Sequence, residues 1–208
     1  MSPVEATAAR PRVEGEREQE ILDATLDVLA DVGYDRLTMD AVASAARASK
    51  ATLYRRWETK AILVLEAVIA QKGPIDEALD TGTLRGDLIA SHCAGRGGLT
   101  DERQIAVFGS VITALSRDPE FAEAFRTRFV GPKIARTLDL FERARARGEL
   151  REDVDLNVLA PALAGIVLHN QFILGQQPTP ESITAVIDQV ILPAVLASTG
   201  TRTHKEFS

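Results

Sequence analysis

Apolar residues recur along this chain at the three- and four-residue spacing of one helix face, and segments with the alternating pattern of a strand are nearly absent. The first such stripe contains Ile21, Leu22, Leu26, Leu29 and Ala30, with Val28 and Val32 widening it. Gly33 follows where a left-handed residue would end the helix. The pattern therefore predicts an all-α fold that begins with one long amphipathic helix.

Three hydroxyl side chains then stand where the next helices should begin. Thr38, with Asp40 in the first turn, predicts a short helix to about Ala46. Ser49 predicts a second one to about Trp57, and Thr59 a longer one to about Ala70. Short helices joined by loops of a few residues predict a compact head over residues 14–60.

The rest of the chain predicts a second, larger helical domain over residues 61–199, for about nine helices in all. Pro132 follows Gly131 inside one long segment and predicts a kink there. We expect residues 1–13 to be a disordered arm and residues 200–208 a disordered tail. The expected helices of this domain are Gly86–Cys93, Thr100–Arg117, Asp118–Arg147, Asp155–Leu174 and Thr179–Ala197.

Charge and cysteine content exclude several classes of protein. The net charge is −6, but residues 47–60 carry five basic side chains and one acidic one, a local charge of +4. A short basic patch on an acidic body fits docking on DNA by one face. The single cysteine, Cys93, excludes an internal disulfide and a multi-thiolate metal site. We expect neither a metal nor a cofactor. The longest apolar run, residues 160–168, is much shorter than the roughly 20 residues that a membrane span needs. Because the sequence also shows no secretory signal, we expect a cytoplasmic protein.

Residues 38–57 have the pattern of a helix-turn-helix. Two short helices crossing steeply need small or apolar inner residues, and Val42, Ala43, Ala46 and Leu53 are spaced to form that seam. The polar residues Lys50, Thr52, Arg55 and Arg56 are left for the outer face of the second helix. A purely structural helical hairpin would need the same seam.

From Leu37 to Leu63 the sequence resembles the TetR (tetracycline repressor) family of transcriptional regulators. The resemblance is carried by Thr38, Ser49, Lys50, Leu53, Tyr54, Trp57 and Lys60. The chain departs from the family pattern at five positions. The family usually has glycine where this chain has Arg47 and Ala51, and valine where it has Ala48. It commonly has histidine at the position of Arg56 and phenylalanine at that of Trp57. A non-glycine residue in a left-handed turn costs about 1 kcal/mol. The resemblance implies a dimeric DNA-binding protein, most often a repressor released from its operator by a small molecule.

The family and the chemistry of the side chains together suggest roles. Thr38 and Ser49 cap helices whose N-termini suit a phosphate oxygen. The predicted base-reading residues are Lys50, Ala51 and Thr52, and the predicted phosphate contacts are Tyr54, Arg55 and Lys60, with Arg56 able to do either. Trp57 is predicted to be a core anchor against the first helix. Arg10 and Arg12 could reach an adjacent groove, although a solvated tail is the simpler interpretation.

The last two helices are predicted to form a homodimer. Their apolar surface is broad, and the family resemblance implies a four-helix interface, although burial within one subunit is the alternative. A two-fold dimer predicts a palindromic double-stranded operator with half-site centres roughly 34 to 36 Å apart, or a multiple of that. The candidate interface residues are Leu159, Leu163, Ile166, Val167, Ile183, Val186, Ile187, Val190 and Ile191.

The middle of the chain is where the resemblance places an effector cavity. An apolar cavity would favour a lipophilic or aromatic effector. The candidate ligand residues are His92, Cys93, Phe108, Phe125, Phe129 and His169, although ordinary core is the better interpretation of each phenylalanine. An enzyme is the second hypothesis, but neither an HExxH motif nor a phosphate-binding loop is present. A ligand-sequestering helical protein with a vestigial DNA-binding head is the third.

Overall fold

The computed structural model describes residues 14–72, 80–93 and 102–196, and their regular structure is helical, apart from one isolated bridge between Leu150 and Leu196. The all-α prediction is confirmed. None of the described helices is long and apolar enough to cross a membrane. The elements are α1 (Glu14–Arg36), α2 (Met39–Ala45), α3 (Lys50–Arg56), α4 (Lys60–Lys72), α5 (Leu84–Cys93), α6 (Glu102–Arg117), α7 (Pro119–Phe125), η1 (Arg126–Val130), α8 (Gly131–Ala146), α9 (Leu156–Leu159), α10 (Ala162–Phe172), α11 (Pro180–Val186), η2 (Ile187–Ile191) and α12 (Leu192–Val195).

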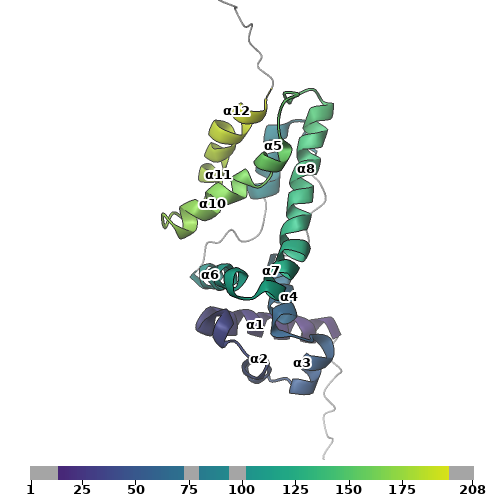
Figure 1. Ribbon diagram of the computed structural model, residues 1–208, viewed down its shortest axis with the longest axis vertical. Helices are drawn as coiled ribbons and strands as arrows, with labels where there is room; N and C mark the ends of the chain where they lie inside the picture. The colour runs from purple at the N-terminus through teal and green to yellow at the C-terminus, as the bar shows by residue number, and fades with distance from the viewer. Residues whose placement is uncertain (1–13, 73–79, 94–101, 197–208) are drawn as a thin grey trace, which may run out of the picture.

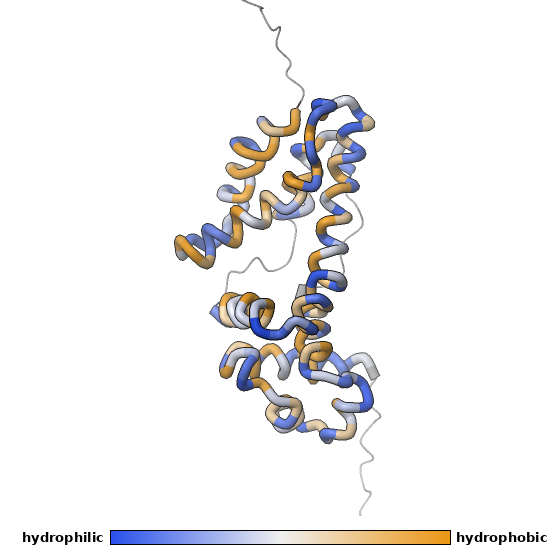
Figure 2. The backbone as a smooth tube through the Cα atoms, viewed as in Figure 1, coloured by the Kyte–Doolittle hydropathy of each residue, from blue (hydrophilic) through white to orange (hydrophobic). Residues whose placement is uncertain are grey.

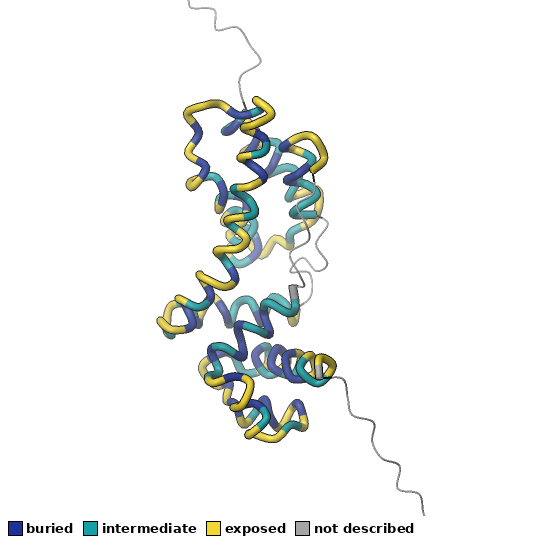
Figure 3. The backbone as a smooth tube through the Cα atoms, turned by 90° about the vertical axis from the view of Figure 1, so that its right-hand side faces the viewer, coloured by how far each residue is buried: buried dark blue, intermediate teal, exposed yellow. Residues whose placement is uncertain are grey.

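The helices are built around two hydrophobic cores. The first core joins α1 to α4 with α6, α7 and η1, and the second joins α5 with α8 to α12. Figure 1 shows α1, α2 and α3 at one end of the molecule, α5 and α10 to α12 at the other, and α8 rising between them. Buried positions occur in both halves (Figure 3). The first core continues well past residue 60, where we expected the DNA-binding head to end, because α4, α6 and α7 pack on α1 or on one another.

A π-helical turn, η1, lies inside the long helix that the sequence predicted with a kink at Gly131 and Pro132. The N–H of Gly131 donates to the carbonyl of Arg126, five residues back. Pro132 follows directly and has no N–H to donate, so the α-helical bonding pattern is broken at this point. The predicted irregularity is confirmed, and its form is a widened turn rather than a bare proline kink.

Several predicted boundaries differ from the structure. The expected helix over residues 155–174 is divided into α9 and α10 at Pro161, and the expected last helix contains the π-turn η2. The α5 helix begins at Leu84, two residues before Gly86. Gly33 interrupts α1 with a φ of 74°, as expected, but helical structure resumes to Arg36. The expected start at Thr100, the arm and the tail lie outside the described residues.

Asp87 fixes the start of α5 to the end of α8. Its carboxylate is fully buried and accepts bonds from the Thr81 N–H at 2.7 Å, the Thr81 hydroxyl at 2.8 Å and the Arg147 guanidinium at 3.2 Å. Burial acts to raise the pKa of Asp87, but these donors outweigh it and hold the pKa below its ordinary value. The ionised form is therefore the one that stabilises the fold.

Replacing Asp87 with asparagine should lower the free energy of unfolding by about 1 to 3 kcal/mol at pH 7, because a buried bond to a charged group is lost. A lowered folded pKa gives stability that is complete above the unfolded pKa of about 4 and is lost as the pH falls through the folded value. Urea unfolding at several pH values should show the variant and the wild type converging in acid. Asp139→Asn, an exposed acid on α8, is the matched control. A difference that is the same at every pH would contradict this account.

Candidate nucleic-acid interface

The seam between α2 and α3 is closed by the residues that the sequence placed there. Val42 and Leu53 have no exposed surface, and Ala43 and Ala46 are buried beside them. Thr38 and Ser49 act as the predicted caps, each accepting a backbone N–H at 3.1 Å, from Ala41 and Thr52 respectively. Capping and burial together hold two very short helices in one arrangement.

The turn between α2 and α3 contains a strained residue. Arg47 has a φ of 50° and is the only described non-glycine residue with a positive φ. Its N–H donates to Ser44 and the next N–H, of Ala48, donates to Ala43 at 2.9 Å, the paired bonds of a left-handed helix cap. Its carbonyl accepts a bond from the Arg17 guanidinium at 2.8 Å, which ties the turn to α1.

Arg47→Gly should therefore stabilise the protein by about 1 kcal/mol, because glycine adopts a positive φ without a Cβ clash. The melting temperature should rise by about 2 to 4 °C for a chain of this size. Arg55→Gly, an exposed position inside α3, should shift it in the opposite direction by a similar amount. Thermal unfolding followed by circular dichroism measures both. If Arg47→Gly does not raise the melting temperature, the turn is not strained.

The outer face of α3 is free to meet a partner. The exposed residues on this face are Lys50, Ala51, Tyr54 and Arg55, and Tyr54 is 54% exposed. Lys50 pairs with Asp40 at 2.5 Å, but both side chains are more than half exposed, so the pair is weakly held. Thr52 is half-buried, with its hydroxyl 2.8 Å from that of Ser49.

Arg56 and Lys60 are engaged within the chain. The Arg56 guanidinium donates to Glu18 of α1 at 2.9 Å and lies 5.5 Å from the centre of the Trp57 ring. The Lys60 ammonium donates to the Tyr34 carbonyl at 3.0 Å and lies 4.4 Å from the centre of the Tyr34 ring. Both cations therefore bond to α1 at its junction with the end of α3 and the start of α4.

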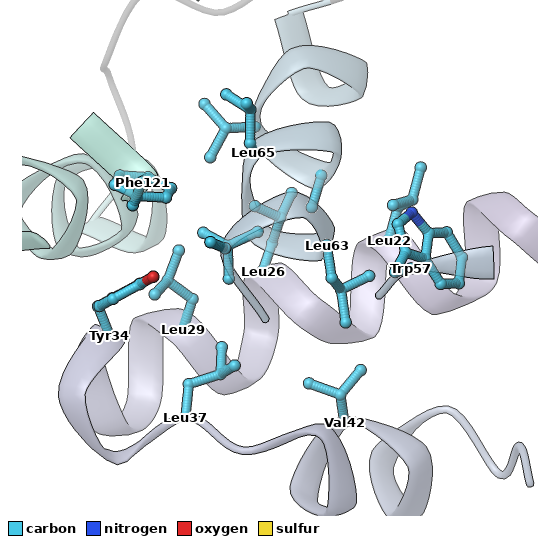
Figure 4. Close-up of a cluster of buried hydrophobic side chains, with 14 of the residues drawn as sticks. Leu22, Leu26, Leu29, Tyr34, Leu37, Val42, Trp57, Leu63, Leu65 and Phe121 are labelled. Atoms are coloured by element: carbon cyan, nitrogen blue, oxygen red, sulfur yellow. The ribbon is translucent and has the colours of Figure 1, made fainter. Parts of the chain in front are cut away.

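Trp57 is the core anchor that the sequence predicted. Only 1% of it is exposed, and Figure 4 shows its ring beside Leu22 of α1. Its indole N–H donates to Glu66 of α4 at 2.7 Å. Glu66 also accepts a bond from Arg128 of η1 at 3.0 Å, so one carboxylate joins α3 to the long helix. The sequence analysis missed this link, because no local pattern marks Glu66.

An aromatic row connects the end of α1 to α8, and the sequence analysis missed it as well. The Tyr34 hydroxyl donates to Asp118, the cap of α7, at 2.6 Å. Burial, with the Asp118 carboxylate, raises the pKa of Tyr34, and the Phe121 N–H with the Tyr34 hydroxyl lowers that of Asp118. Figure 4 shows Tyr34 facing Phe121. The row consists of Tyr34, Phe121, Phe125 and Phe129, with ring centres 4.9, 5.9 and 4.7 Å apart, and Lys133 lies 4.5 Å from the last ring.

The structure does not bring the candidate ligand residues together. Phe125 and Phe129 belong to the first core, so the ordinary interpretation holds for them. Phe108 of α6 stacks on Phe172 of α10, with ring centres 5.6 Å apart. The remaining candidates are His92, half-buried on α5, Cys93 beside the Pro180 carbonyl, and His169, which is exposed. Among the described residues, no group of acids, histidines and cysteines could hold a metal ion.

Three candidate interface residues are corrected by the structure. Leu163, Ile187 and Ile191 are at most 4% exposed and pack inside the second core of their own subunit. Val190 is 46% exposed, and the other candidates are half-buried. Hydrophobic colour runs along α10 to α12 in Figure 2. The exposed large apolar residues on and beside these helices also include Val158, Ile173 and Leu174.

Comparisons with known proteins agree with this geometry. Residues 21–67 match the family model for bacterial regulatory proteins of the tetR family, and residues 78–190 match that for the tetracyclin repressor-like C-terminal domain. The chain is 38% identical over 188 residues to the uncharacterized HTH-type transcriptional regulator Rv1556 of Mycobacterium tuberculosis, covering 88% of this chain and 90% of that one. It is 35% identical over 190 residues to the DNA-binding transcriptional repressor TetR of Mycobacteroides abscessus, covering 89% and 96%.

A solved structure gives the same result. The TetR family transcription regulator SCO0332 matches with 29% identity and a TM-score of 0.61, covering 88% of this chain and all of that one. The fold and its capped helix-turn-helix define a DNA-binding transcriptional regulator. The chain belongs to the TetR family.

Proposed function

We propose that this protein is a homodimeric repressor that binds a palindromic operator through α3 and is released by a small molecule. The observation that carries the proposal is the free outer face of α3, held by two capped helices over a closed seam. The M. abscessus relative, named as a DNA-binding transcriptional repressor, supports the direction of regulation.

The exposure of the side chains supports a division of roles on this face. Lys50, Ala51 and Thr52 open α3, where helix-turn-helix proteins read base edges. Tyr54 and Arg55 stand on the exposed side of the same helix and would contact phosphates, as would the capped N-termini at Thr38 and Ser49.

Lys60 and Arg56 would act with less freedom. The Lys60 ammonium has three N–H donors, so its bond to the Tyr34 carbonyl leaves donors for a phosphate. Arg56 is held by Glu18, and we propose that it mainly orients α3 on α1.

One DNA-binding head alone would bind DNA weakly, because a few phosphate contacts give only salt-sensitive affinity. We therefore propose that two heads act together in a dimer. We place the interface on the exposed apolar side of α9, α10, α11 and η2, without Leu163, Ile187 and Ile191, which the subunit core buries. Val158 of α9 and Val190 of η2 are its most exposed members among the described residues. Large apolar side chains that are exposed on neighbouring helices are typical of subunit contacts.

Release by an effector requires a physical connection between the two cores. The aromatic row and the Glu66 link supply one, because both join the head to η1, which continues directly into α8. A ligand that favours a different position of α8 would move Tyr34, whose carbonyl holds Lys60. Linkage then requires that the ligand weaken DNA binding.

A mobility-shift assay with a labelled duplex from upstream of the protein's own gene tests the proposal. The wild type should give a shift that weakens with salt, and Tyr54→Ala should lose most of it. Ile112→Ala, an exposed apolar residue on α6, should bind like the wild type. No shift from the wild type at low salt, or equal binding by Tyr54→Ala, would overturn the function.

A further inference from the structure

Arg136 on α8, a helix that packs against α5, has no hydrogen-bond or ion-pair partner among the described residues. Its Nε atom is buried and has no hydrogen-bond acceptor within the described part of the chain. The guanidinium forms no ion pair there either. Asp139, three residues on, is exposed and makes no ion pair with it. A buried guanidinium N–H without an acceptor costs free energy, so such an atom in a native fold calls for an explanation.

At the other end of the same helix, Arg147 has acidic hydrogen-bond partners, unlike Arg136. Arg147 bonds Asp87 of α5 at 3.2 Å and Glu149 at 2.6 Å. Asp87 is the only acid in α5, and it is already used. At the level of Arg136, α5 presents His92 instead of a carboxylate. The α5 and α8 pair is therefore neutralised at one end and left positive at the other.

His92 lies close enough to Arg136 and Lys133 to be affected by their charges, and one of its ring nitrogens has no hydrogen bond among the described residues. Its Nδ1 lies 2.9 Å from the Leu88 carbonyl, which can only accept, so Nδ1 carries the proton and Nε2 is left for another partner. Burial lowers the pKa of His92, and the charges of Arg136 and Lys133 lower it further. An anion placed here would reverse that effect of charge and let Nε2 donate to it.

The surroundings of this cluster are apolar. Leu88 on α5 and Leu140 on α8, each one turn along from His92 and Arg136, are about 1% exposed in the second core. We propose that Arg136, with His92, is the anchor of the effector site and that the effector is a carboxylate on an apolar body. This inference rests on the proposed function, because it names the chemistry of that effector.

Thermal shift and calorimetric titration of the full chain with decanoate, below its micelle-forming concentration, test the site. Decan-1-ol is the probe of equal chain length without the charge. Decanoate should bind the wild type and raise its melting temperature more than the alcohol does. Arg136→Met should bind decanoate at least about tenfold more weakly, since bonds to charged groups are the stronger ones. Arg136→Lys should recover part of the affinity, and Arg145→Met, whose arginine pairs with Glu142, should match the wild type.

Proton NMR of His92, assigned with His92→Asn, gives a second measurement. The pKa of His92 should rise when decanoate binds, and Arg136→Met should raise it without the probe. Equal affinity of wild type and Arg136→Met for decanoate, no binding by the wild type, or an unchanged His92 pKa would each overturn the site. Any of these results from a protein that still shifts its upstream duplex refutes the anion site and leaves the proposed function standing. If decanoate binding depends on Arg136 but the protein binds no duplex, the anion site stands and only the proposed function is refuted.

Discussion

Replacing Trp57 with alanine is expected to lower the free energy of unfolding by about 3 to 5 kcal/mol and to abolish DNA binding. The indole is almost fully buried between α1 and α4, and its N–H satisfies Glu66. The truncation would leave a cavity next to Leu22 and remove the anchor at the end of α3 (Figure 4). Because α3 has only seven residues, it has little helical stability of its own and depends on this packing.

Trp57→Phe is the matched control. Phenylalanine keeps most of the apolar volume, and Glu66 keeps its bond to Arg128. This variant should lose about 1 kcal/mol and retain DNA binding. Urea unfolding measures the stability, and a mobility shift measures the binding. If Trp57→Ala were as stable as Trp57→Phe, Trp57 would not be the anchor of the head.

The second large effect is expected at Lys60. Lys60→Ala should weaken binding to every duplex by at least about tenfold and reduce the slope of log K against log salt by about 1 for each head, because a phosphate contact is lost. Thr52→Val should instead weaken binding to the preferred sequence and leave binding to unrelated duplexes nearly unchanged. Fluorescence anisotropy over a range of salt concentrations separates the two.

Lys133→Ala removes a lysine that is also stacked on an aromatic ring but lies on α8, and it serves as the control for charge alone. It should leave the salt slope unchanged. Equal effects of Lys60→Ala and Thr52→Val on all sequences would refute the division between phosphate contact and base reading.

Features set by neighbouring residues were predictable from the sequence. The caps at Thr38 and Ser49, the seam of Val42 and Leu53, and the interruption at Gly33 all depend on spacings of a few residues. Arg47 was recognised as a strained position because the resemblance places it where the TetR family usually has glycine, and the structure gives it a φ of 50°. Trp57 was recognised because a large aromatic residue ending a short helix has few alternatives to the core.

Features that join distant residues were not predictable in this way. Tyr34 and Asp118 lie 84 positions apart, and Arg56 finds its acid 38 positions upstream. The apolar stripes of the last helices are broad enough for two partners, so spacing alone did not separate Leu163, Ile187 and Ile191, which face the subunit core, from the exposed Val190. Pro161 was overlooked as a break because the apolar run continues across it.

Selection of bound duplexes from a random library, followed by sequencing, tests the central claim most directly. The full-length protein should enrich a palindrome whose half-site centres are roughly 34 to 36 Å apart, or a multiple of that distance, as two heads on one two-fold axis require. Thr52→Val should alter the enriched bases within each half-site and leave their spacing unchanged. Enrichment of no sequence, or of single half-sites without a partner, would contradict the account of a dimeric operator-binding regulator.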